Sequence, residues 1–198
     1  AHVLSKKLSQ NDTLSAYDRK QMDFIANLLE KYYGEVFGIE HTDKDFGNLT
    51  VTNGIVKMSE GKISLCFDMR YGASLDIKEA KAKISRFFDN NGWSVDFARE
   101  SDPFILSDDN PYIVACMNTY KDFTKKHDAK SFVNAGGTYA RYLPCAAEIG
   151  TSLNGGKRPF DLPAGHGSVH QPDECISIDG LLNAIELTML MLLECDKQ

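Results

Sequence analysis

Apolar side chains recur at helical spacing in three parts of the chain, and residues that begin or end helices bound each part. A capping box at Ser15–Asp18 opens the first part and Gly34 ends it, which predicts a helix over about 16–33. Asp76 opens the second helix, which Asn90–Gly92 ends, and Asp179 is expected to cap a third at the C-terminal end. The expected buried stripes are Met22, Ile25, Leu28, Leu29 and Tyr32 in the first; Ile77, Ala80, Ile84 and Phe87 in the second; and Leu181, Leu182, Ile185, Met189, Leu192 and Leu193 in the third.

Two strand-like runs lie between the first two helices, and apolar and polar residues alternate strictly in the second. One strand passes through Leu49, Val51 and Ile55, and a second is the alternating run 63–69. Residues 59–62 are the expected hairpin turn. Asn53-Gly54 could also form such a turn, but a bulge is favoured there because the flanking halves would be short. Alternation over 93–97 predicts a third strand, which completes an α+β unit of about 100 residues.

Beyond this unit, polar and proline-rich segments interrupt the pattern, so a domain boundary is expected near 101–104. Pro111 suits the first position of a helix that runs to about residue 125. Short buried strands are expected at Val133 and at 146–149. The segment 150–174 has no apolar periodicity, and long irregular loops of this kind are often functional. At the other end of the chain, residues 1–14 are polar and are expected to be irregular.

Composition narrows the functional classes. The 198 residues are 42% hydrophobic and 25% charged, with a formal net charge of -6, which is ordinary for a soluble globular protein. No basic stripe is present to neutralise phosphates, so nucleic-acid binding is disfavoured. The chain shows neither a secretory signal nor an apolar run of membrane-spanning length, so a cytoplasmic protein without membrane insertion is expected. The five cysteines are widely spaced and are interpreted as structural thiols.

Two segments of the C-terminal half carry residues suited to metal and anion binding. His170 lies in a polar loop before the last helix, where a neutral imidazole could bind a metal; the alternative is a surface histidine beside Asp173 and Glu174. His166, four residues earlier, could pair with it or simply be mobile. In Gly136-Gly137-Thr138, backbone N–H groups could approach a carboxylate closely, although a plain tight turn has the same composition.

Two arginines could bind a substrate carboxylate through two parallel hydrogen bonds. Arg70 ends the second predicted strand, on the polar face that also carries Asp68. A solvated Asp68–Arg70 ion pair is the alternative, and the pattern alone favours it. Arg141 could play the same role from the glycine segment, or it could pair with an acidic residue.

Three segments, in this order along the chain, resemble the zinc-dependent aminoacylase, carboxypeptidase and dipeptidase family, and most nearly bacterial dipeptidases of the PepV type. They are Asp68–Gly72 (Asp-Met-Arg-Tyr-Gly), Gly136–Arg141 (Gly-Gly-Thr-Tyr-Ala-Arg) and His170–Glu174 (His-Gln-Pro-Asp-Glu). The resemblance extends from about residue 15 to the end. It implies that residues 1–101 are the second half of a ferredoxin-like lid domain. Residues 102–198 would then be the C-terminal part of an α/β catalytic domain.

The resemblance also implies roles for individual residues. His170 would be a zinc ligand, while Arg70 and the Gly136–Arg141 segment would hold the terminal carboxylate of a dipeptide or small peptide. In this family two zinc ions activate a water molecule for peptide hydrolysis, with a glutamate as general base. The family's other metal-binding motifs have no counterpart here, so this chain is expected to be inactive alone and to need the N-terminal half of the enzyme as its partner.

The sequence is compatible with two further hypotheses. The α+β unit could be a non-enzymatic binding module that forms a homodimer through an exposed strand edge. A cysteine nucleophile, Cys145 or Cys175 with His170, has neither the spacing nor the resemblance in its favour.

Overall fold

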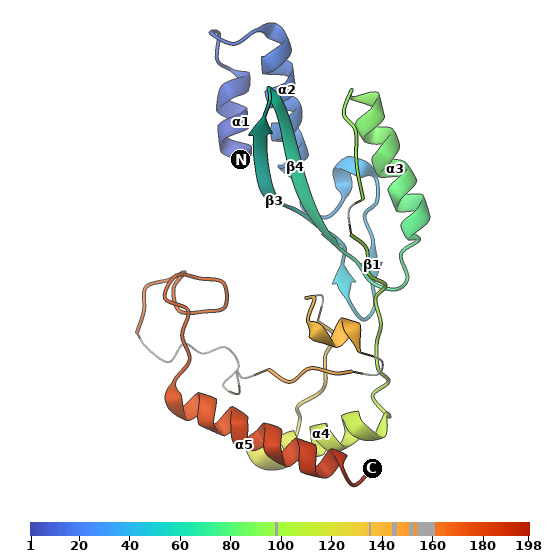
Figure 1. Ribbon diagram of the computed structural model, residues 1–198, viewed down its shortest axis with the longest axis vertical. Coiled ribbons are helices and arrows are strands. Elements are labelled where there is room, and N and C mark those ends of the chain that lie inside the picture. The colour runs from blue at the N-terminus through green and yellow to red at the C-terminus, as the bar shows by residue number, and fades with distance from the viewer. Residues whose placement is uncertain (98, 135, 144–145, 151–152, 154–160) are drawn as a thin grey trace. The chain divides into compact units, whose positions relative to one another are not determined.

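The computed structural model describes residues 1–97, 99–134, 136–143, 146–150, 153 and 161–198 (Figure 1). They form a mixed α+β structure, as predicted, with five α-helices and two antiparallel two-stranded sheets among the described residues. The chain divides into two compact units. Unit 1 comprises Ala1–Phe104 with Val133–Gly136, and unit 2 comprises Ile105–Phe132 with Gly137–Gln198.

Unit 1 begins with two helices that pack against each other, α1 (His2–Ser9) and α2 (Ala16–Leu28). The Ser15 cap of α2 is confirmed, because its side chain accepts a hydrogen bond from the N–H of Asp18. The expectation of an irregular start was wrong. A short polar helix is marginal in isolation, and α1 is held by tertiary contacts, including one of 2.9 Å between His2 Nδ1 and the carbonyl oxygen of Ala26.

Helix α2 ends at Leu28, five residues before the predicted end, and the chain then turns at Gly34 into the 3₁₀ helix η1 (Glu35–Phe37). Gly34 has a φ of +85°, and a Cβ there would lie 2.7 Å from the side chain of Ile39. The turn therefore requires glycine. Two short strands follow, β1 (Thr42–Asp43) and β2 (Gly47–Asn48), which pair with each other.

The predicted hairpin is confirmed as β3 (Thr50–Ser59) and β4 (Lys62–Arg70). Glu60 and Gly61 form the turn, both with positive φ, as tight hairpin turns require. The register shifts between Asn53 and Ile55, which confirms the bulge. Residues 63–69 alternate as predicted, with the odd positions partly buried and the even positions exposed.

Helix α3 (Ile77–Asn90) completes the core of unit 1, and the carboxylate of its cap Asp76 accepts from the N–H groups of Lys78 and Glu79. The third strand predicted at 93–97 is absent from the described residues of that segment, which are irregular. The alternation of this segment reflects partial burial on one side, although its described residues pair with no strand. Trp93, for example, stacks on Phe24 of α2 with ring centroids 5.6 Å apart. The buried residues of this core are Leu28, Ile39, Leu49, Val51, Ala80, Ile84 and Phe88.

Unit 2 contains α4 (Pro111–Thr124), the 3₁₀ helix η2 (Tyr139–Tyr142) and α5 (Ile178–Cys195). Helix α4 has the predicted bounds and is capped by Asn110. The short strands expected at Val133 and 146–149 are wrong, because these described residues have no strand conformation. The cap of α5 is Ser177 rather than Asp179, since the Ser177 hydroxyl accepts from the Gly180 N–H at 3.0 Å.

The predicted buried stripe of α5 is also wrong. The buried residues are Ala184, Leu187 and Met191, whereas all six predicted residues are exposed. Helix α5 is apolar on most of its circumference, so its periodicity does not identify the side that packs against α4. At this contact the sulfur atoms of Cys116 and Cys195 lie 3.6 Å apart. Burial, followed by the neighbouring Cys195 thiol, raises the pKa of Cys116 to about 11.

No helix in the described part of the chain has the length and apolarity needed to cross a membrane.

Candidate functional site

Arg70 is the last residue of β4 and lies on the exposed face of the hairpin. Its Nε donates to Asp68 Oδ2 at 3.1 Å, and 49% of its side chain is exposed. This is the solvated ion pair that the alternating pattern favours. The guanidinium has further N–H groups, so a substrate carboxylate could bind Arg70 without removing Asp68.

The glycine segment Gly136–Thr138 forms a turn closed by side chains. The N–H of Gly136 donates to Asn134 Oδ1 at 2.8 Å, so this donor is already engaged within the chain. Thr138 caps η2, its hydroxyl accepting from the Ala140 N–H at 3.3 Å. Gly137 is exposed. A four-residue 3₁₀ helix has too small a dipole to attract an anion appreciably, so any carboxylate here would be held by local groups. The side chain of Arg141 lies outside the described part of the structure.

The predicted metal-binding loop, residues 165–175, is closed on itself by backbone hydrogen bonds. The N–H of Gly167 donates to the carbonyl oxygen of Pro172 at 2.8 Å, and the N–H of Gln171 donates to that of Ser168 at 3.0 Å. His170 has a φ of +62°, which is uncommon outside glycine. Its backbone N–H donates to Glu174 Oε2 at 3.0 Å. The loop is therefore an ordered turn that holds the His170 ring at the surface.

His166 has a contact that the sequence did not reveal. Its Nδ1 lies 2.7 Å from Asp173 Oδ2, and the ring is about one-third exposed. A carboxylate on one imidazole nitrogen orients the ring and leaves Nε2 available, which is how histidine ligands of metal ions are commonly supported. The loop thus presents two candidate metal ligands. The sequence motif points to the imidazole of His170, and the contact with Asp173 points to that of His166.

These residues do not make a zinc site by themselves. The described residues contain no group of three or more histidine, cysteine, aspartate or glutamate side chains that could hold a metal ion. Zinc in proteins takes about four ligands. The loop could supply one or two imidazole ligands to a metal that other groups also bind.

A second polar cluster joins segments of unit 1 that are 31 residues apart. Ser74 Oγ donates to Asp43 Oδ2 at 2.5 Å and also contacts His41 Nε2 at 2.8 Å. The buried Asp43 carboxylate accepts additionally from the backbone N–H groups of Asp45, Phe46 and Ser74. Its bond from the Ser74 hydroxyl and then these backbone bonds hold the pKa of Asp43 far below its ordinary value.

This cluster has the residue types of a hydrolytic triad but not its order. In a triad the histidine lies between the carboxylate and the serine and removes the serine proton. Here the serine lies between, and its proton is directed at Asp43, so His41 cannot act as its base. Gly72 leaves the space that the Asp43 side chain occupies, since a Cβ at position 72 would lie 2.3 Å from Cγ of Asp43. The cluster is a structural clamp just beyond Arg70, and its one sequence signal is glycine at position 72.

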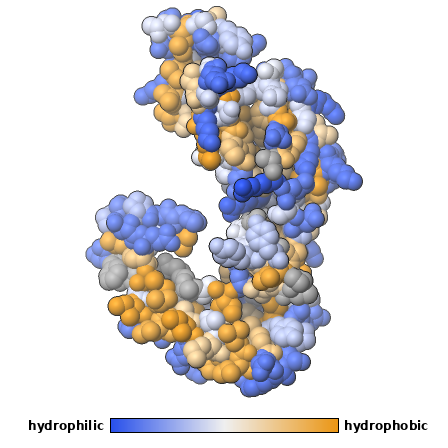
Figure 2. All heavy atoms as spheres, viewed as in Figure 1, coloured by the Kyte–Doolittle hydropathy of each residue, from blue (hydrophilic) through white to orange (hydrophobic). Residues whose placement is uncertain are grey.

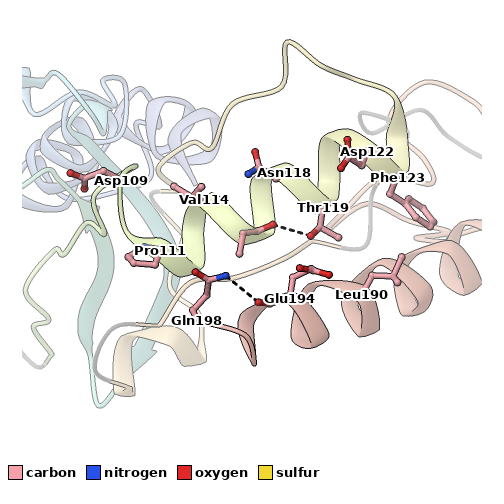
Figure 3. Close-up of a pocket in the computed structure, with 11 residues that line it drawn as sticks. Asp109, Pro111, Val114, Asn118, Thr119, Asp122, Phe123, Leu190, Glu194 and Gln198 are labelled. Atoms are coloured by element: carbon pink, nitrogen blue, oxygen red, sulfur yellow. Dashed lines mark hydrogen bonds between the residues drawn. The ribbon is translucent and has the colours of Figure 1, made fainter.

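An open groove of about 760 Å³ lies between α4 and α5 (Figure 3). Pro111, Val114 and Phe123 line it from α4, with Leu190 and Glu194 from α5. Of the predicted site residues whose side chains the structure describes, none lines it. The groove follows from the incomplete packing of two helices rather than from a cluster of reactive side chains.

Comparison with known proteins gives one informative relationship. The chain is 29% identical over 170 residues to the Bacillus subtilis (strain 168) protein named "Putative dipeptidase YtjP". The matched stretch is 83% of this chain but only 34% of that relative. No protein-family model matches the chain. The similarity supports a relationship to peptidases, and the chain corresponds to about a third of the length of the relative.

Proposed function

We propose that this chain is the substrate-binding and metal-contributing C-terminal part of a zinc-dependent dipeptidase. The observation that carries the proposal is its similarity, along 83% of its length, to a protein named as a dipeptidase. Hydrolysis would require metal ligands beyond those that the described residues supply. In this proposal the chain therefore acts together with the polypeptide that corresponds to the rest of such an enzyme.

The proposed roles are those that the resemblance in sequence implies, and the chemistry of each residue is compatible with its role. Arg70 binds the terminal carboxylate of a dipeptide or small peptide through its planar guanidinium. The Gly136–Arg141 segment contacts the same end of the substrate. His170 supplies one imidazole to zinc, and His166, oriented by Asp173, is the competing ligand within the same loop.

The test is reconstitution. This chain is mixed with the separately expressed part of the Bacillus subtilis relative that it does not match, with zinc, and dipeptide hydrolysis and zinc binding by calorimetry are measured. We expect weak zinc binding and no hydrolysis by the chain alone, and both tight binding and hydrolysis in the mixture. His170→Ala should abolish both properties, whereas His127→Ala, which changes an exposed histidine elsewhere, should leave them intact.

The variant His166→Ala decides between the two imidazoles. If His170 is the ligand, His166→Ala keeps most of the zinc affinity. If His166→Ala removes zinc binding and His170→Ala does not, the motif assignment is wrong and the geometric one holds. A mixture that neither binds zinc nor cleaves dipeptides would contradict the proposed function.

One observation favours a second candidate, a homodimerising module. Within the described structure the hairpin has no strand paired beside β3, and Ile55, Val56 and Met58 of this strand are exposed. An open apolar edge can pair with a second copy. Sedimentation would detect the dimer, and Val56→Lys should dissociate it.

A further inference from the structure

Helix α5 has a continuous apolar face that no described part of unit 2 covers. Its seven large residues are between 42% and 77% exposed. At about 100° per residue they fall within an arc of about 120°, the width of a stripe that normally faces a protein core. They are Ile178, Leu181, Leu182, Ile185, Met189, Leu192 and Leu193, here called the outer stripe. Figure 2 shows apolar surface gathered over α5.

The opposite side of α5 already has its partner. Ala184, Leu187 and Met191 are buried, and α5 packs against α4. In a stable domain, each apolar side of a helix or sheet is covered by another layer of structure. A helix with two apolar sides therefore belongs between two layers. Unit 2, as described, provides one of these layers.

The charges around the outer stripe indicate what kind of surface covers it. Helix α5 contains Asp179, Glu186 and Glu194 but neither lysine nor arginine. Helices that lie on anionic membranes carry basic residues on their polar face, so a membrane surface is a poor fit. Pairing with the same helix of a second copy would bring acidic flanks together. A different polypeptide surface fits best.

We infer that the outer stripe of α5 is the docking face for the polypeptide that corresponds to the part of the dipeptidase relative that this chain does not match. The relative is about three times as long as the matched stretch, since that stretch is 34% of its length. A wholly apolar contact without charges is typical of permanent interfaces. This inference rests on the proposed function and adds the surface through which the two parts assemble.

The test uses the whole 198-residue chain and, as probe, the unmatched part of the Bacillus subtilis relative. Photoreactive p-benzoylphenylalanine is placed at Ile185 in the outer stripe or, as control, at the exposed Asn183 beside it. We expect cross-linking to the probe from position 185 and at least tenfold less from position 183. The double variant Leu182→Lys/Ile185→Lys should weaken capture of the probe at least tenfold, and Asn183→Lys should not.

The remaining outcomes are decisive too. Cross-links from position 185 to a second copy, to another part of the same chain, or to nothing overturn the inference. Thermal unfolding of the isolated double variant should match that of the original chain, which shows that lost capture is not lost folding. Capture without dipeptide hydrolysis would retain the docking face and reject the enzymatic function. If the double variant still supported hydrolysis in the mixture, the docking face would be rejected and the enzymatic function retained.

Discussion

The two units of this chain bury their apolar residues to different extents. In unit 1, α2, the hairpin and α3 surround one core of seven buried residues, with an aromatic cluster packed against it. In unit 2, the buried apolar residues among those described are three, all on α5. The chain has apolar side chains in both units, so the difference lies in the number of layers. Unit 1 encloses its core, and unit 2 leaves one face of α5 exposed.

The largest effect should come from truncating a residue inside the enclosed core. Leu49 is 1% exposed and Leu49→Ala should lower the free energy of unfolding by about 2–5 kcal/mol, because a cavity remains where the side chain was. The matched variant is Leu182→Ala in the outer stripe, which should change the free energy of unfolding by less than about 0.5 kcal/mol. Urea unfolding measures both. Equal losses would show that unit 2 is as well packed as unit 1.

The next effect concerns the clamp at the end of β4. Gly72→Ala places a Cβ against the buried side chain of Asp43, which cannot move aside without losing its hydrogen bonds. We expect the free energy of unfolding to fall by about 1–3 kcal/mol. Gly54→Ala is the matched control, since no atom lies within 4 Å of a Cβ there. Equal free energies of unfolding for the two variants would show that position 72 does not pack closely against Asp43.

Acid should release the same clamp. The pKa of Asp43 is lowered by the Ser74 hydroxyl and then by backbone N–H groups, so its ionised form stabilises the folded state. This contribution is complete above the ordinary carboxyl pKa of 3.8 and is lost as the pH falls below it.

The variant Asp43→Asn should therefore unfold at a lower temperature than the original chain at pH 7, with the difference shrinking below about pH 4. The exposed Asp89→Asn serves as the control and should show no such trend. A pH-independent difference for Asp43→Asn would mean that the carboxylate charge does not matter. Thermal melts followed by circular dichroism at several pH values are sufficient.

The smallest effect on stability is expected for Arg70→Ala. An exposed ion pair such as Asp68–Arg70 contributes about 0–1 kcal/mol. In the reconstituted mixture, however, loss of the guanidinium should raise KM for a dipeptide at least tenfold. Lys57→Ala, a cation change on the neighbouring strand, should leave KM unchanged. An unaltered KM in Arg70→Ala would remove Arg70 from the proposed substrate site.

Local chemistry made several features predictable from sequence. Ser15 and Asp76 cap helices through atoms within three residues of themselves, and the turn at Glu60–Gly61 follows from its own backbone angles. The bulge at Gly54 and the alternation of β4 were equally local. The roles of Arg70, Gly136, Gly137, Thr138, Arg141 and His170 come from a resemblance in sequence and stay predictions.

Other features depended on contacts between distant residues. Helix α1 lacks strong periodicity and exists because α2 offers it a surface. The clamp joins Asp43 to Ser74 across 31 residues, and the His166–Asp173 contact requires the loop to close on itself. The buried side of α5 could not be read from a helix that is apolar nearly all round.

The sequence by itself thus determined where α2 and α3 begin and where the β3–β4 hairpin turns, because capping and turn formation involve neighbouring residues only. The tertiary structure decided which apolar face is buried and which polar groups meet, because burial depends on what other element is present to cover a surface.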